Sequence, residues 1–274
     1  MSATRPASSA GDRVFFATLI GLGLTYLLLV VAMLLADASF TTLPAIQAAL
    51  ARPEIRHAFG LSFITATITA ILSVWFAVPI GYIMGRRQFP GKALVDAVLD
   101  IPIVLPPMVI GLSLLILFQT GAGKQLEAGF KAAFGVGITY EVPSIVIAQF
   151  AVSCAFAIRT LRVTFDQLDP RCEEVARTLG CSSRQAFWHV VLPSAWKGVL
   201  SAGLLAWARA LGEFGPVLVF SGATRMKTEV LPSTVFLELS VGDLEAAVAV
   251  SLVLVAAAVG CLLLGRLLGL KVGR

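Results

Sequence analysis

Long apolar stretches without a single charged residue dominate this sequence. Val14 to Ala36 and Phe59 to Met84 are the clearest of them. Each is long enough to cross a bilayer, which takes about 20 residues of helix. Only 14% of the 274 residues are charged, whereas an ordinary soluble domain has about 25%. Since backbone groups in lipid must be hydrogen-bonded within their own segment, these stretches predict membrane-spanning helices.

The same criterion predicts an all-α membrane protein with about six spanning helices and no separate soluble domain in residues 1–274. The spans are expected at about 14–36, 59–84, 93–118, 142–163, 198–223 and 246–266. Pro102, Pro106 and Pro107 should kink or break the third span. The first apolar run is longer than the core of a signal peptide, so we expect it to be retained as a span.

The positive charges lie mostly in alternate segments between the spans. Lys and Arg favour the cytoplasmic side of a membrane, and their excess is on one side when both chain ends are placed in the cytoplasm. The net charge of +5 is therefore interpreted as a membrane-orientation signal. No dense basic stretch is present, so nucleic acid is not an expected partner.

The longest segment between spans, residues 164–197, has the pattern of two short helices. Asp169-Pro170 is typical of a helix start, and Gly180 of a left-handed helix end. Ser182 and Gln185 have the spacing of a capping box. Leu192-Pro193 predicts the end of the second helix. Short helices persist in water only when something packs on them, so this hairpin is either a docking surface for another protein or a cap on its own bundle.

A family resemblance is carried by this hairpin. Glu174-Val175-Ala176, Gly180, Val190 and Leu192-Pro193 resemble the coupling-loop signature of ABC importer permeases, Glu-Ala-Ala followed at fixed spacing by Gly, Ile and Leu-Pro. Val175 and Val190 are mild departures. The resemblance implies that this loop docks on the ATPase and that the contact involves Glu173, Glu174, Ala176, Arg177, Gly180, Phe187, Leu192 and Pro193.

The resemblance also implies the partners. They are a cytoplasmic ABC ATPase dimer, a second permease copy that is identical or related, an extracytoplasmic substrate-binding protein and the lipid of a prokaryotic inner membrane. ATP and magnesium would be bound by the ATPase, and no cofactor by this chain.

A second match lies in the fifth span. Ala208 to Gly215 resembles permeases for tetrahedral oxyanions, with molybdate or tungstate favoured and sulfate next. The residues implied as a translocation path or gate are Arg209, Gly212, Glu213, Phe214 and Gly215. Charges inside a membrane usually face a cavity or a partner. Arg209 and Glu213 either pair with each other or line the path, and the glycines either serve the path or allow close helix packing.

No catalytic site can be assembled from the sequence. Gly121-Ala-Gly-Lys124 lacks the first glycine and the Ser or Thr of a phosphate-binding loop, and the four cysteines form no paired motif. We therefore expect a non-catalytic subunit, with import of iron, thiamine or a polyamine, or secondary transport without an ATPase, as alternatives. A short helix over Val230 to Leu237 is expected at the outer mouth, either lying in the headgroups or receiving the binding protein.

Overall fold

The computed structural model describes residues 10–268 and is helical throughout that range apart from turns and loops. The two extreme termini, whose basic residues contribute to the expected orientation, lie outside it. The helices are α1 (Ala10–Phe40), α2 (Leu43–Ala51), α3 (Pro53–Arg86), α4 (Lys92–Val104), α5 (Pro107–Gln119), α6 (Gly121–Phe134), α7 (Val142–Gln167), α8 (Pro170–Thr178), α9 (Ser183–Ala186), the π-helix η1 (Phe187–Val191), α10 (Leu192–Leu211), α11 (Gly215–Ser221), α12 (Leu231–Val241) and α13 (Leu244–Leu267).

Five of these segments are long and apolar enough to cross a membrane, and α4 with α5 makes a sixth if the bent pair counts as one span. The expected all-α architecture with about six spans is therefore confirmed. Three helices were not expected from the sequence as separate elements. They are α2, α6 and the short α11 beyond the end of α10.

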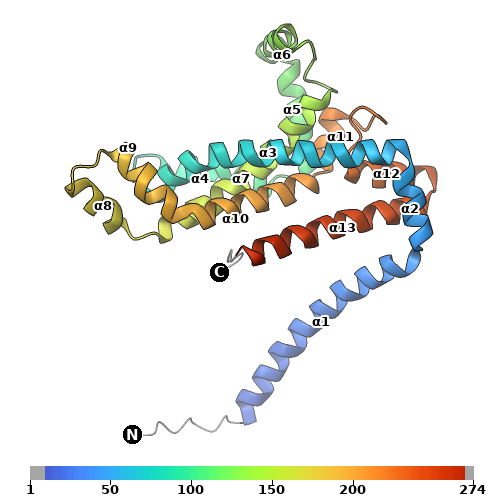
Figure 1. Ribbon diagram of the computed structural model, residues 1–274, viewed down its shortest axis with the longest axis horizontal. Coiled ribbons are helices and arrows are strands. Elements are labelled where there is room, and N and C mark those ends of the chain that lie inside the picture. Colours follow the sequence, from blue (N-terminus) through green and yellow to red (C-terminus); the bar gives the residue numbers. More distant parts are fainter. Residues whose placement is uncertain (1–9, 269–274) are drawn as a thin grey trace.

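The centre of the molecule is a bundle of α3, α7 and α10, which lie alongside one another (Figure 1). Small side chains make up much of their shared core, including Ala77, Ala157, Ala202 and Ala206, all fully buried. Small residues let helix backbones approach closely, which is how helices associate where lipid removes most of the hydrophobic driving force. Gly81 illustrates this, because a Cβ there would lie 2.9 Å from the Leu161 Cβ.

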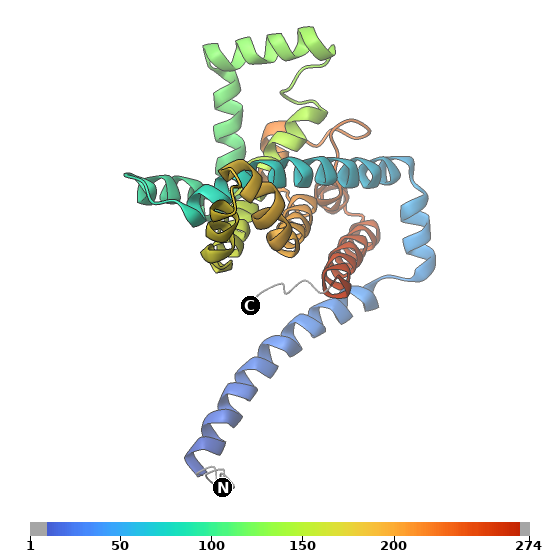
Figure 2. The same ribbon diagram turned by 60° about the vertical axis from the view of Figure 1, so that its left-hand side comes forward.

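Two parts of the chain leave this bundle. Helix α1 runs away from it, and none of its apolar window is buried (Figures 1 and 2). Helices α5 and α6 project on the other side (Figure 2). The chain turns by 110° between α4 and α5, at the Leu105–Pro106 junction, so the expected break of the third span is confirmed there. Pro102, by contrast, is accommodated inside α4.

The hairpin between α7 and α10 forms largely as the local signals predict. The Asp169 side chain accepts a hydrogen bond from the Arg171 amide, and Ser182 and Gln185 form a capping box. Gly180 has a φ of +94°. However, the expected helix end at Leu192-Pro193 is wrong. The helix continues from α9 through η1 into α10 (Figure 1). A π turn accommodates the proline. In it the Leu192 amide donates to the Phe187 carbonyl, one residue further back than in a regular α-helix.

Candidate functional site

The hairpin is attached to the bundle by one side and exposed on the other. The Tyr82 hydroxyl of α3 donates to Glu173 Oε1 at 2.8 Å, and its ring contacts the Phe187 ring with centroids 4.8 Å apart. Ala176 in α8 is buried, whereas Leu179, at the end of this helix, is 80% exposed. The hairpin therefore has a fixed position and presents an apolar surface that the described chain leaves uncovered.

The predicted hairpin residues divide between these two sides. Glu173, Ala176 and Phe187 lie toward the bundle, and Leu192 is partly buried. Exposed residues are Glu174, Arg177, Gly180 and Pro193, together with Val175 and Trp188, which the sequence analysis did not single out for the site. Val175 and Trp188 could have been predicted as site residues, because they are apolar side chains in a segment expected to lie outside the membrane.

A second candidate site is the interruption of the expected fifth span. Helix α10 ends at Leu211, and α11 begins at Gly215. Glu213 therefore lies beyond the helix rather than on its face, which corrects the expected continuous span. The Gly212 amide still bonds back to α10, but a Cβ at Gly212 would meet only the Ala208 carbonyl. Gly212 is thus a helix end rather than a packing contact.

Arg209 and Glu213 pair with each other across this interruption. Arg209 Nη1 lies 2.6 Å from Glu213 Oε2, and the Glu213 side chain is only 1% exposed. The Arg209 guanidinium also lies 5.7 Å from the centre of the Phe156 ring of α7. Mutual pairing is therefore confirmed. The Arg209 side chain nevertheless remains 30% exposed.

The two broken spans interlock. Gly215, at the start of α11, packs on Pro107 at the start of α5, where an added Cβ would lie 3.0 Å from the proline Cβ. Gly111, one turn further along α5, packs on Pro216, where a Cβ would lie 2.8 Å from the Pro216 Cα. Both breaks of the bundle thus meet in one place, which we call the crossed break (Leu105–Gly111 and Leu211–Pro216). Phe214 connects it to α12 through the Phe236 ring, 5.6 Å away.

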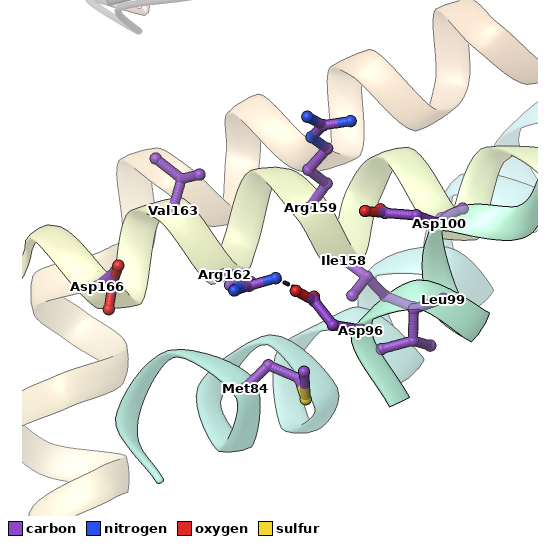
Figure 3. Close-up of a pocket in the computed structure, with 10 residues that line it drawn as sticks. Met84, Asp96, Leu99, Asp100, Ile158, Arg159, Arg162, Val163 and Asp166 are labelled. Carbon is purple, nitrogen blue, oxygen red and sulfur yellow. Dashed lines mark hydrogen bonds and ion pairs between the residues drawn. The ribbon is translucent and has the colours of Figure 1, made fainter. Parts of the chain in front are cut away.

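A cavity of about 370 Å³ lies between α4 and α7, with Met84 of α3 in its lining (Figure 3). Arg162 points at Asp96 and forms an ion pair with it, which fastens α4 to α7 (Figure 3). Arg159, Asp100 and Asp166 complete the charged lining. Carboxylates outnumber guanidinium groups here, so the lining does not favour an anion. Asp96 and Asp100, one turn apart in an apolar segment, were the signal that sequence reasoning missed.

Charged groups also tie the opposite end of the bundle together. Arg225 Nη2 lies 2.9 Å from Glu238 Oε1, and Arg52 contacts both Glu238 and Asp243. These contacts hold the loop 222–230 and the start of α3 against α12. Leu231, Ser233, Thr234 and Glu238 of α12 are buried, so this helix, expected over Val230 to Leu237, is confirmed as a helix but packs into the protein on one side.

Glu229 in this loop is fully buried, and neither of its carboxylate oxygens has a hydrogen-bond partner among the described residues. Burial raises the pKa of Glu229, and the negative charges of Glu238 and Glu54 raise it further, while the positive charge of Arg225 opposes the shift. The folded state therefore holds this proton more tightly than the unfolded state. The stability that comes from this tighter proton binding is fully present below the ordinary Glu pKa of 4.5 and is lost as pH rises through the raised pKa of Glu229.

We predict that the thermal midpoint of the purified protein falls as pH rises above 4.5 and that Glu229→Gln makes the fall shallower. The amide stays neutral at every pH, so this variant should be more stable than the unaltered protein at the alkaline end. Thermal unfolding in detergent across a pH series measures it. Glu245→Gln, which removes an exposed carboxylate near the same end, is the control. An unchanged slope in Glu229→Gln would contradict the assignment.

Known transport proteins are similar to this chain in sequence. Residues 77–271 match the family described as "Binding-protein-dependent transport system inner membrane component". A sulfate transport system permease protein, CysW, of Synechocystis is 37% identical over 93% of this chain and 93% of its own length. A molybdate/tungstate transport system permease protein, WtpB, of Pyrococcus abyssi is 37% identical over 61% of each chain.

A solved structure shares the fold. The crystal structure of a bacterial ABC transporter involved in the import of the acidic polysaccharide alginate aligns with a TM-score of 0.74, covering 96% of this chain and 97% of that one, at 12% identity. The residues that carried the resemblance to ABC importer permeases thus lie within the matched range. The chain belongs to the inner membrane component family of binding-protein-dependent transport systems, as a multi-pass transmembrane subunit of an importer.

Proposed function

We propose that this chain forms the path by which an ATP-driven importer moves a tetrahedral oxyanion: molybdate, tungstate or sulfate. The observation that carries the mechanism is the unbroken helical connection from the hairpin to the crossed break. Helices α9, η1 and α10 follow one another without a loop. A force applied to the hairpin is therefore transmitted along α10 to Leu211, where the helix ends beside Arg209 and Glu213.

The hairpin is the proposed contact for the ATPase. Its outward surface carries exposed Val175 and Leu179 flanked by Glu174 and Arg177, and apolar surface rimmed by charges is typical of a protein-binding patch. The inward side, held by Tyr82, keeps the hairpin in register with α3. Under this proposal the hairpin and both chain ends are cytoplasmic, and the ATPase dimer binds ATP and magnesium.

Two further partners belong to the proposal. A second permease copy, identical or related, would complete the path, and an extracytoplasmic binding protein would deliver the anion at the opposite end of the bundle, where α12 and the loop 222–230 lie. Selectivity would rest largely on that binding protein. A path that held the dianion tightly would also trap it, so weak contacts along the path suffice.

The proposal is tested by reconstituting the chain with its ATPase in lipid and adding binding protein loaded with molybdate, tungstate or sulfate. We expect at least one loaded form to stimulate ATP hydrolysis and anion uptake. If no oxyanion does so, while iron, thiamine or a polyamine does, the substrate class is wrong. Uptake driven by a proton gradient without the ATPase would overturn the importer mechanism.

Gly180→Ala should weaken ATPase binding by about tenfold. A residue with a Cβ pays about 1–2 kcal/mol to adopt the left-handed backbone of this turn, which lowers the population of the hairpin conformation that docks. An added Cβ at Gly180 meets nothing within 4 Å, so the effect would come from the backbone alone. The measurement is a titration of detergent-solubilised permease with ATPase subunit. Gly260→Ala on α13, which also meets nothing within 4 Å, is the control. Equal affinity in both variants would show that the hairpin turn is dispensable for docking.

A further inference from the structure

Gln149 lies fully buried in the middle of α7, in a stretch that is otherwise apolar or small. Its Nε2 donates to the Ala210 carbonyl at 3.0 Å, and its Oε1 accepts from the Thr69 hydroxyl of α3 at 3.1 Å. A carbonyl can only accept, so Nε2 must face Ala210 and Oε1 must face Thr69. The side chain therefore joins all three helices of the central bundle with a defined orientation.

The bond to Ala210 reaches the crossed break directly. Ala210 belongs to the last turn of α10, whose carbonyls lose their usual partners where the helix ends. Its carbonyl also accepts from the Glu213 amide at 3.2 Å. One oxygen thus connects Gln149 to the backbone of Glu213. Further along α7, Phe156 lies against the Arg209 guanidinium, so α7 contacts Arg209 directly and is linked to Glu213 through the Ala210 carbonyl.

We infer that Gln149 is a positioning residue for the translocation path. It fixes the end of α10 to α7 and Thr69 and so sets where Arg209 and Glu213 stand when the hairpin moves. The inference rests on the proposed function of the crossed break. Intact helices satisfy their own carbonyls, whereas this amide bonds to a carbonyl at the interrupted end of α10, so its loss acts on the crossed break itself.

The test uses the reconstituted complex with its ATPase and loaded binding protein. Gln149→Leu keeps a side chain of similar size and removes both hydrogen bonds. We expect maximal uptake to fall by about tenfold or more. The binding-protein concentration at half-maximal stimulation should stay unchanged, because Gln149 is fully buried and its hydrogen bonds go to Thr69 and Ala210, outside the proposed docking surfaces. ATP consumed per anion should rise. A general packing defect would instead lower complex yield, ATP hydrolysis and uptake together.

Ser153→Ala is the matched control. Ser153 lies one turn further along the same helix and is fully buried, with a hydroxyl that has no hydrogen-bond partner among the described residues, so its loss should leave uptake unchanged. Thr69→Val removes the supporting hydroxyl. We expect it to reduce uptake less than Gln149→Leu does and to add nothing to it in the double variant, while Thr69→Ser should restore uptake.

The outcomes separate the two proposals. If the unaltered complex imports no oxyanion, the proposed function fails. If it does import one and Gln149→Leu keeps the same uptake and the same ATP consumption per anion, the inference is overturned. Should Gln149→Leu fail to assemble, the Thr69 variants decide, because the inference requires Thr69→Val to lower uptake and Thr69→Ser to recover it. Equal uptake in both would refute it.

Discussion

Gly111→Ala is expected to separate α5 from α11 and to abolish most uptake, although it adds only a methyl group. The added Cβ would lie 2.8 Å from the Pro216 Cα and 2.9 Å from the Pro216 carbonyl oxygen. Backbone atoms of a proline cannot rotate away, so the helices themselves must move. Overpacking of this kind costs about 1–3 kcal/mol, and the displacement falls on the crossed break, where α5 and α11 fix each other.

Thermal unfolding and anion uptake of the same preparation measure the two effects of Gly111→Ala. Gly60→Ala on α3 is the control, since a Cβ there meets nothing within 4 Å, and it should match the unaltered protein in both assays. Full uptake by Gly111→Ala would mean that α5 and α11 need not stay in contact during transport. In that case the crossed break could not be the gate.

Sequence reasoning succeeded where the signals are local. The spans follow from runs of apolar residues, and the start of α8 and the capping box of α9 follow from side chains that bond to backbone within a few residues. The turn at Gly180 follows from the positive φ that a residue without a Cβ adopts readily. The same reasoning failed at Pro193. A proline interrupts the hydrogen bonds of a regular α-helix, but here a π turn accommodates it and the helix continues. The helix that follows, α10, packs on α3 and α7, and this packing is not visible in the local sequence.

The contacts along the proposed path could not be predicted without the tertiary structure. Gln149 is a lone polar residue in a long apolar run, and nothing nearby in the sequence shows that its partners are Thr69 and Ala210. The interruption after Leu211 is similarly hidden, because hydropathy stays high through α11. What the sequence did show was that Arg209 and Glu213 are too costly to stand alone in a membrane, and their pairing confirms that argument.

Arg209→Met should destabilise the protein more than any other single change to the crossed break. It leaves the Glu213 carboxylate, 1% exposed, without its counter-charge, and breaking a buried pair by removing one partner costs about 3–5 kcal/mol. Glu213→Gln should be milder, because Arg209 can reach solvent and still contact the Phe156 ring. Thermal unfolding in detergent ranks the two.

The double variant Arg209→Met with Glu213→Gln separates the two roles of the pair, because it removes both charges at once. Stability should recover most of the loss caused by Arg209→Met, since no uncompensated charge remains buried. Uptake should not recover, because an anion passing the crossed break would no longer meet the partly exposed guanidinium. Recovery of both would reduce the pair to a structural brace and place the path elsewhere. If Arg209→Met alone proved as stable as the unaltered protein, Glu213 would need no partner at all, and the electrostatic account of this break would be wrong.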